Sequence, residues 1–357
     1  MCRSARPRPS TPMTETAPDT IGMRRALLGL GDQLERAAAS VPERELPAGA
    51  SFANVVLAGM GGSGIAGDIA VAVAGPDCPV PMTVVKGYEC PAFVGPGTLA
   101  AVLSFSGNTE ETLSVAQAAH AAGATVVAVT SGGTLAELAE QWGAPVYRVD
   151  ASIPMPRAAV GAMAVPPLLA LRAAGLAGDV EEQVAGAVAQ VRARLAGSAV
   201  GEAADGAAGS AAGADGAAFV VCGAGDLGTA AALRWKTQLN ENTKVPAAVG
   251  ALPELCHNEL AGWQVSLEHA RRVRMFFLRH DFEHEQNKRR FEYYAQVLAD
   301  AGVPAPIEVA AAGDGRLAQL FDLMAQGDAL SLELAAALGR DPGPVDVLME
   351  LKAFLAA

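Results

Sequence analysis

Short apolar segments alternate with helical patterns along most of the chain, and this alternation constrains the fold more than any other feature of the sequence. In the first half, the expected helices lie at 63–75, 109–123 and 134–143, and the expected strands at 52–60, 81–88, 97–107, 125–131 and 145–150. Strands that alternate with helices of about ten to fifteen residues predict a parallel sheet covered by helices on both faces. In such sheets a ligand binds beyond the carboxyl ends of the strands.

The same alternation returns after residue 217, with strand patterns at 218–225, 273–280 and 306–311. Helical patterns lie between and after them, at 227–241, 283–302 and 316–338. We therefore expect an α/β protein with two doubly wound parallel-sheet domains, flanked by N- and C-terminal helices. The expected division is a disordered tail (1–20), an N-terminal helix (21–50), a first sheet domain (51–153), connecting helices (154–194), a low-complexity linker (195–217), a second sheet domain (218–340) and a C-terminal helix (341–357).

Composition supports a globular protein and excludes several kinds of partner. The 357 residues are 51% hydrophobic and 18% charged, which allows two domains that each bury a core. The net charge of −12 disfavours a nucleic-acid partner, because duplex binding needs a basic surface. No apolar run is long enough for a membrane span. The five cysteines form no C-x-x-C pair, which is typical of reduced thiols in a cytoplasmic protein: Cys2, Cys78, Cys90, Cys222 and Cys256.

Two segments are too poor in bulky apolar residues to belong to a folded core. The linker at 195–217 consists mostly of Ala, Gly, Ser and Asp, and it cannot bury enough apolar area to offset chain entropy. The basic, proline-rich start of the chain lacks the apolar region of a secretory signal. We expect a disordered tail there, with translation from Met13 as an alternative start.

A glycine-rich loop follows the first strand pattern. Residues 59–64 read Gly-Met-Gly-Gly-Ser-Gly, which satisfies the G-x-G-x-x-G fingerprint of dinucleotide-binding proteins. A nicotinamide cofactor would also require an acidic residue about twenty positions later, at the end of the second strand. The chain has Lys86 there instead. A second such loop at 223–228 is equally expected wherever a strand turns tightly into a helix, so we expect no dinucleotide cofactor.

A cluster of hydroxyl side chains follows the strand pattern at 97–107. Ser104, Ser106 and Thr109 lie close together, and a helical pattern begins directly after them. A phosphate monoester is held by backbone N–H groups at a helix N-terminus together with hydroxyls. Hydrogen bonds to a charged group contribute about 1.5–3 kcal/mol each, so four or five of them could hold a sugar phosphate without a metal. The alternative is an ordinary serine-rich turn with a helix cap.

The loop GMGGSG (59–64) and the segment SFSGNTEET (104–112) together resemble the sugar isomerase (SIS) domain family. More narrowly, the chain resembles the bifunctional phosphoglucose/phosphomannose isomerases of archaea and bacteria. The resemblance extends from residue 21 to the C-terminus, apart from the low-complexity run. It is carried further by PMPRAAVG (154–161), NENTKVPA (240–247), PELCHNE (253–259) and the final lysine, Lys352.

This resemblance implies two SIS-type domains and an enzyme of carbohydrate metabolism. The implied reaction interconverts glucose 6-phosphate, and also mannose 6-phosphate, with fructose 6-phosphate through an enediolate. It uses neither a cofactor nor a metal. The implied partners are the hexose 6-phosphate substrate and a second copy of the chain, in a homodimer with its active site at the subunit interface. A non-catalytic sugar-phosphate sensor and a nicotinamide-dependent oxidoreductase are the alternatives.

Aldose–ketose exchange needs a base at the two carbons, an acid–base group at the ring oxygen and a positive charge near the enediolate. By the resemblance, Glu241 transfers the proton, and His257 opens the ring from the neighbouring subunit. Arg157 is the candidate for stabilising negative charge, because a guanidinium stays protonated and presents a rigid fork. Lys352 would close over the substrate. The residues expected to bind the phosphate are Gly61, Gly62, Ser63, Ser104, Ser106 and Thr109.

Two other motifs invite functional interpretations that we consider less favourable. His280 and His284 are four positions apart and would share one face of a helix, but the charge-rich surroundings favour a solvated helix start over a metal site. Cys256 precedes His257, yet adjacent side chains usually point in different directions. The sequence does not decide whether Glu254 or Glu259 orients the ring of His257.

One position departs from the family pattern. In the segment DPGPV (341–345), Gly343 stands where many members have a threonine, which is thought to help the pocket admit both C2 epimers. The missing hydroxyl makes mannose 6-phosphate activity a less certain expectation than glucose 6-phosphate activity.

Overall fold

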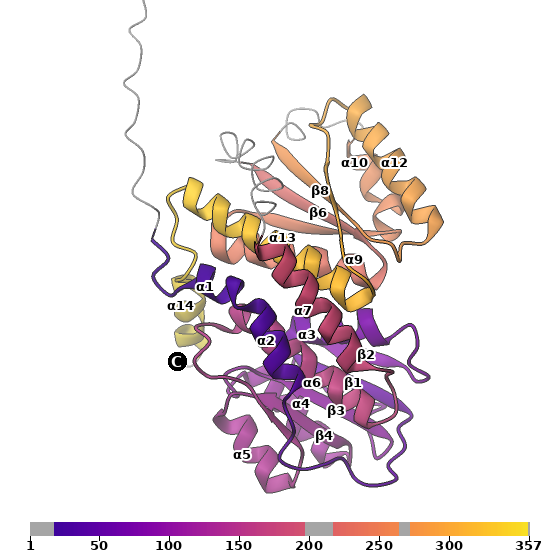
Figure 1. Cartoon of the computed structure of the whole chain (residues 1–357), viewed down its shortest axis with the longest axis vertical. Helices are drawn as coiled ribbons and strands as arrows, with labels where there is room; N and C mark the ends of the chain where they lie inside the picture. Colours follow the sequence, from indigo (N-terminus) through magenta and orange to yellow (C-terminus); the bar gives the residue numbers. More distant parts are fainter. Residues whose placement is uncertain (1–17, 197–216, 264–271, 356–357) are drawn as a thin grey trace, which may run out of the picture.

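The computed structural model describes residues 18–196, 217–263 and 272–355, which form two parallel β-sheets with helices on both faces of each (Figure 1). The first sheet has five strands in the order β2-β1-β3-β4-β5, namely β1 (Asn54–Gly59), β2 (Met82–Val85), β3 (Thr98–Leu103), β4 (Thr125–Thr130) and β5 (Val146–Arg148). The second has four strands in the order β7-β6-β8-β9, namely β6 (Ala218–Ala224), β7 (Ala247–Leu252), β8 (Val273–Arg279) and β9 (Ile307–Ala310). All neighbouring strands in both sheets are parallel, so the expected fold class is confirmed.

Each sheet has an outer and an inner layer of helices. On the outer face of the first sheet lie α4 (Glu110–Ala121) and α5 (Gly133–Trp142), whose small side chains pack on alternate strand residues. On the outer face of the second lie α10 (Glu259–Trp263) and α12 (Glu285–Asp300). The inner layer consists of α2 (Leu30–Ala38), α3 (Gly61–Ala74), α6 (Val160–Ala173), α7 (Val180–Ala196), α9 (Gly225–Gln238) and α13 (Arg316–Ala337).

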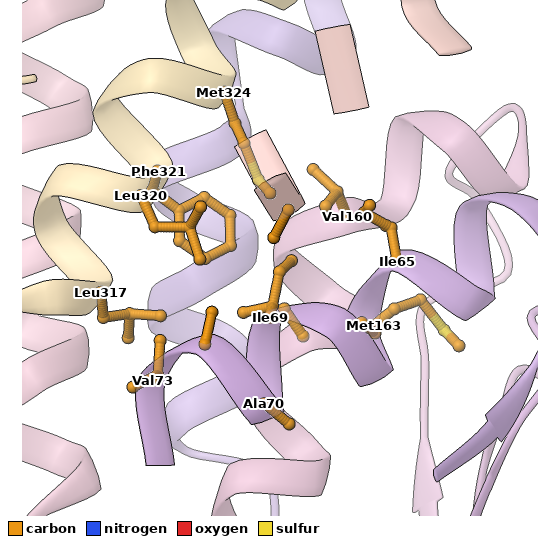
Figure 2. Packing of buried hydrophobic residues seen from close by; sticks show 14 of the residues in the cluster. Ile65, Ile69, Ala70, Val73, Val160, Met163, Leu317, Leu320, Phe321 and Met324 are labelled. Atoms are coloured by element: carbon orange, nitrogen blue, oxygen red, sulfur yellow. The ribbon is translucent and has the colours of Figure 1, made fainter. Parts of the chain in front are cut away.

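The inner helices of the two sheets pack against each other, so the two halves share one hydrophobic core. Figure 2 shows side chains of α13, among them Phe321 and Met324, pointing toward Ile69 of α3, while Ile65 of the same helix lies beside Val160. We expected two domains that each bury a core. Separate clusters do lie outside each sheet, but the largest cluster runs from one sheet to the other. This shared core fixes the position of one half relative to the other.

Three local expectations differ from the structure. The N-terminal helix expected at 21–50 is two short helices, α1 (Met23–Leu28) and α2, divided at Gly29, because glycine disfavours the helix interior. Strand β7 was not expected, since its Ala- and Gly-rich sequence has low strand propensity. The C-terminal helix α14 is shorter than expected and spans Asp346–Leu355.

Most of the expected tail (1–20) and linker (195–217) lies outside the residues that the structure describes. Residues 1–17, which include Met13, and 197–216 lie beyond the described residues. In the described part of the chain, no helix combines the length and the apolar character that a membrane span requires.

Candidate active site

The guanidinium of Arg157 lies at the centre of the candidate site, at the junction of the two halves. Arg157 belongs to the short helix η1 (Pro156–Ala159), which leads from the first sheet into α6, and it is 3% exposed. Its Nη1 atom lies 3.4 Å from Oε2 of Glu241. Its Nε donates to Oδ1 of Asn242 at 3.1 Å, and Nη2 donates to the carbonyl oxygens of Pro342 at 2.6 Å and Gly343 at 2.8 Å. Every nitrogen of the fork therefore has a partner.

Burial shapes the electrostatics of this cation. Desolvation lowers the pKa of the Arg157 guanidinium, the carboxylate of Glu241 opposes that shift, and nearby Arg234 reinforces it. An arginine begins so far above neutral pH that it stays protonated. The site consequently holds a fixed positive charge in a poorly solvated place, where it acts strongly on any negative charge that develops nearby.

Glu241 is presented by a π-helical turn, η3 (Leu239–Thr243), that continues α9. Such a turn inserts extra backbone and is frequent at functional sites. Asn242 and Thr243 point inward and are buried, whereas the Glu241 side chain is 26% exposed. The turn ends at Lys244, which has a left-handed φ of 58° and donates from Nζ to the Glu241 carbonyl at 2.6 Å. The carboxylate is thus open to a ligand while its backbone is held.

The glycine-rich loop lies directly against the arginine turn. It links β1 to α3, which starts at Gly61. A Cβ atom on Gly62 would lie 2.8 Å from both the nitrogen of Arg157 and the carbonyl carbon of Pro156, so only glycine allows this close approach. Within the described residues, no side chain caps the N-terminus of α3. The N–H of Ser63 is bonded to the carbonyl of Met60, so the N–H groups of Gly61 and Gly62 are the ones open to an anion beside Arg157.

The hydroxyl cluster lies beside the glycine-rich loop at the same end of the sheet. Ser63 Oγ accepts from the N–H of Phe105 at 3.0 Å, which joins the two loops. Ser104 Oγ is buried and lies 3.0 Å from Oγ1 of Thr109, the residue before α4. Ser106 is exposed, and its Oγ accepts from Asn108 at 3.3 Å. The six residues expected to bind phosphate are therefore brought into two adjacent loops.

Lys86 lies next to the glycine-rich loop. Its ammonium donates to the carboxylate of Asp68 on α3, and its Cε would lie 3.3 Å from a Cβ on Gly64. Burial raises the pKa of Asp68, while the lysine opposes that shift. A cation thus occupies the place at which a dinucleotide-binding protein has an acidic residue.

His257 and Lys352 are both exposed on the surface of the single chain. His257 ends the short helix η4 (Glu254–His257), is exposed and borders a shallow hollow of about 220 Å³ with Tyr293 and Val297. Lys352 is exposed on α14. Among the described residues, no hydrogen bond or ion pair joins either of them to Arg157 or Glu241. Of the four expected catalytic residues, a single chain thus brings Arg157 and Glu241 together and leaves His257 and Lys352 exposed at its surface.

The question of which carboxylate orients His257 stays open. Oε1 of Glu254 accepts from the side-chain amide of Asn258 at 3.2 Å. Burial raises the pKa of Glu259, whose N–H is bonded to Asn258. For the part of the chain that is described, neither carboxylate is bonded to the imidazole.

The two histidines considered for a metal site have other partners. His280 is buried with Nε2 3.0 Å from the carbonyl oxygen of Ala224. His284 precedes α12, and its Nδ1 accepts from the N–H of Gln286. Over residues 18–196, 217–263 and 272–355, no group of three His, Cys, Asp or Glu side chains is arranged to hold a metal ion.

Gly343, the position that departs from the family pattern, packs against the N-terminal segment. A Cβ there would lie 2.8 Å from Cγ1 of Ile21 and 3.2 Å from Oγ1 of Thr20. The carbonyl of Gly343 faces the Arg157 guanidinium at 2.8 Å. A side chain at this position would therefore contact Ile21, and the backbone carbonyl contacts the Arg157 guanidinium.

The sequence analysis missed two residues of the site. Asn242 and Lys244 both follow Glu241 in NENTK, where the local pattern indicates only the polar residues of a helix end. In the structure Asn242 is fully buried, and a buried asparagine needs hydrogen-bond partners. The partners themselves lie far away in the sequence, so no local pattern identified them.

A family model described as the bacterial phospho-glucose isomerase C-terminal SIS domain matches residues 204–355. A bifunctional phosphoglucose/phosphomannose isomerase of Caldicellulosiruptor bescii is 34% identical over 308 residues, which is 85% of this chain and 89% of that protein. A protein of the same name from Thermoplasma acidophilum is 31% identical over 317 residues, again 85% and 89% of the two chains.

Solved structures share the fold at much lower sequence identity. A hypothetical protein from Thermus thermophilus matches with a TM-score of 0.67 and 17% identity, covering 94% of this chain and 90% of that one. At this identity the likeness concerns the fold alone.

Proposed function

The chain belongs to the family of bifunctional phosphoglucose/phosphomannose isomerases, and from this premise we propose that its reaction takes place at the junction around Arg157 and Glu241. The protein is an isomerase, and its proposed substrates are glucose 6-phosphate and fructose 6-phosphate, with mannose 6-phosphate as a second aldose. The observation that carries the choice of site is the ion pair between a buried guanidinium and a partly exposed carboxylate.

Glu241 is proposed to move the proton between C1 and C2. In one direction the carboxylate takes the proton from C2 of the open-chain aldose, and the electrons of that bond form an enediolate. The same carboxyl returns the proton to C1, while the proton of the C2 hydroxyl passes to the C1 oxygen, so that C2 becomes the carbonyl carbon of the ketose. Arg157 would stabilise the negative oxygen of the intermediate, because its charge is fixed and oriented before the substrate arrives.

The substrate phosphate is proposed to lie in the two adjacent loops, 61–63 and 104–109. The contact between Gly62 and the backbone of Arg157 supports this placement. It puts the phosphate at the N-termini of α3 and α4, where backbone N–H groups and the helix dipoles favour an anion. The exposed hydroxyl of Ser106 is the one with most freedom to turn toward a ligand.

The complete site is proposed to form between two copies of the chain. His257 would open the sugar ring in the partner's site, and Lys352 would close over the substrate. Their exposed positions in the single chain support this view. So does α14, which presents large apolar side chains to solvent, including Met349 (63% exposed) and Phe354 (77% exposed).

The proposed reaction uses no metal and takes place in the cytoplasm. The acid, the base and the positive charge are all supplied by side chains, so treatment with EDTA should leave turnover unchanged. Loss of activity with EDTA and recovery with zinc would contradict this. Cys78, Cys90, Cys222 and Cys256 are free thiols, as is usual in a reducing compartment.

A coupled assay with fructose 6-phosphate tests the proposed function. One arm detects glucose 6-phosphate and the other detects mannose 6-phosphate. Both products are expected from a dual enzyme, and glucose 6-phosphate alone would limit the activity to one epimer. Binding of fructose 6-phosphate without either product would favour a sensor and contradict the proposal.

A further inference from the structure

Buried hydrogen bonds link Arg157 to four other residues in a closed ring. Arg157 Nε donates to Oδ1 of Asn242 at 3.1 Å, and Nδ2 of Asn242 donates to Oγ of Ser331 at 2.9 Å. The Ser331 hydroxyl donates to the carbonyl of Asp328 at 2.7 Å. The carboxylate of Asp328 binds Arg234 at 2.9 and 2.6 Å, and Arg234 Nη2 donates to the carbonyl of Arg157 at 2.7 Å. The path begins and ends on Arg157.

All five members of the ring are buried. Asn242 and Ser331 are 0% exposed, Arg234 is 2%, Arg157 is 3% and Asp328 is 4%. They come from four elements: η1, η3, α9 and α13. Buried polar groups that find their partners restrict the conformations of the chain, because any rearrangement leaves a desolvated donor or acceptor.

The direction of each bond in the ring is fixed by chemistry. The Nε of an arginine can only donate, so the Asn242 atom that faces it must be the oxygen. The Ser331 hydroxyl gives its proton to a carbonyl and therefore accepts from the Asn242 amide. Only a side chain with one acceptor and one donor fits between the two. An aspartate at this position would have the same shape but could not donate to Ser331.

The ring also contains a buried ion pair. Burial raises the pKa of the Asp328 carboxyl, and Arg234 opposes that shift through two hydrogen bonds. Removing one partner of such a pair leaves an uncompensated buried charge, which is strongly destabilising. Arg234 and Asp328 are consequently poor positions for a functional test. Asn242 and Ser331 are neutral and better suited.

We propose that Asn242 is a positioning residue that sets the rotation of the Arg157 guanidinium. With Nε held by Asn242 and Nη2 held by the carbonyls of residues 342 and 343, the remaining nitrogen Nη1 faces Glu241. Asn242 touches no reacting atom and acts only through Arg157. The inference therefore rests on the proposed function, in which Arg157 stabilises the negative intermediate.

The test uses Asn242→Asp and Asn242→Ala, with Ser331→Ala as a milder break in the same ring. Because a small misplacement of a catalytic group can cost about a hundredfold in rate, we expect kcat to fall by about tenfold to a hundredfold for both Asn242 variants. KM for fructose 6-phosphate should stay within about twofold, since Asn242 is bonded to Arg157 and Ser331 and to neither of the loops proposed to bind the phosphate. Ser331→Ala should lower kcat by a smaller factor.

Thr243→Val is the matched control. Thr243 is also buried in η3, and its hydroxyl donates to the carbonyl of Ser331 at 2.8 Å, but it is not part of the ring. This variant should lose thermal stability and keep its kcat. Equal losses of kcat in Thr243→Val and Asn242→Ala, or unchanged kcat in Asn242→Ala, would overturn the proposal.

A second readout does not depend on turnover. The Nε–H proton of Arg157, identified in ¹⁵N-arginine NMR spectra by its absence in Arg157→Lys, should exchange slowly in the wild-type protein. It should exchange at least about tenfold faster in Ser331→Ala and in a folded Asn242→Ala variant, which lacks the acceptor of this proton. Equal exchange in wild type and variants would refute the ring, whereas slow exchange in a protein without isomerase activity would refute the proposed function alone.

Discussion

The Nη1 atom of Arg157 and the Oε2 atom of Glu241 lie 3.4 Å apart, although the two residues come from opposite halves of the chain. Arg157 follows the last strand of the first sheet, and Glu241 lies in the π-helical turn that continues α9, the first helix of the second half. Because the inner helices of both sheets pack into one core, this distance depends on how the halves are joined. The candidate site is therefore a property of the whole fold.

Replacing the carboxylate tests the role of Glu241 directly. The Glu241→Gln variant keeps the shape of the side chain but removes the base, so turnover should fall by about 10²–10⁴-fold with KM little changed. Steady-state kinetics with fructose 6-phosphate measure both. Glu137→Gln, the same change on the exposed face of α5, is the control. Near-normal turnover in Glu241→Gln would exclude the proposed role.

Removing the exposed hydroxyl tests the phosphate site. Since a hydrogen bond to a charged group contributes about 1.5–3 kcal/mol, Ser106→Ala should raise KM by about tenfold to a hundredfold and change kcat much less. Ser114→Ala removes another exposed hydroxyl, one that donates to the carbonyl of Tyr88. It should leave KM unchanged. If KM in Ser106→Ala equals that of the control, the phosphate binds elsewhere.

Mixing two inactive variants tests whether the site is shared between subunits. In a mixed dimer of Glu241→Gln and His257→Ala chains, one of the two sites would contain both intact residues. Random exchange of subunits should then restore roughly a quarter of the wild-type activity. The assay compares each variant alone with an equimolar mixture after dissociation and reassociation. No recovery in a mixture that forms mixed dimers would place both residues in one chain.

Gly343→Thr tests the departure from the family pattern. The new Cβ would lie 2.8 Å from Cγ1 of Ile21, so we expect overpacking to lower the free energy of unfolding by about 1–3 kcal/mol. Denaturant unfolding measures the loss, and the double variant with Ile21→Ala should recover part of it. A stable Gly343→Thr variant with more mannose 6-phosphate activity would show that the residue acts on the substrate instead.

His280 should make stability depend on pH. Burial lowers its pKa below the ordinary value of 6.5, with Arg316 acting in the same direction and with Ala224, Glu283 and Asp281 opposing. As pH falls below about 6.5, the unfolded chain binds a proton that the folded one does not, so stability is present above this pH and is lost on acidification.

The melting temperature measured between about pH 7.5 and about pH 5.5 checks this expectation. The wild-type protein should lose more stability over this range than His280→Phe, which lacks the titrating group. His120→Gln, a change of an exposed histidine, should follow the wild type. Parallel curves for wild type and His280→Phe would contradict the prediction.

Local patterns in the sequence were sufficient for most of the elements and for the position of the two loops proposed to bind phosphate. The alternation of apolar strands with helices predicted the parallel sheets, because strand and helix periodicity is a property of neighbouring residues. The loops at 61–63 and 104–109 could be placed together for the same reason, since the carboxyl ends of adjacent parallel strands meet at one edge. Strand β7 was not predicted, because its small Ala and Gly residues give little periodic hydrophobic signal.

Only the tertiary structure decided which distant residues meet. Arg157 and Asn242 are 85 positions apart, and Asn242 and Ser331 are 89 apart, so no local pattern relates them. Their contact depends on the packing of α3, α9 and α13 into one core. The sequence by itself thus determined the sheets, the loops and the identity of the candidate residues. The packed core decided that the Arg157 guanidinium faces Glu241, because a buried fork must find a partner for every donor.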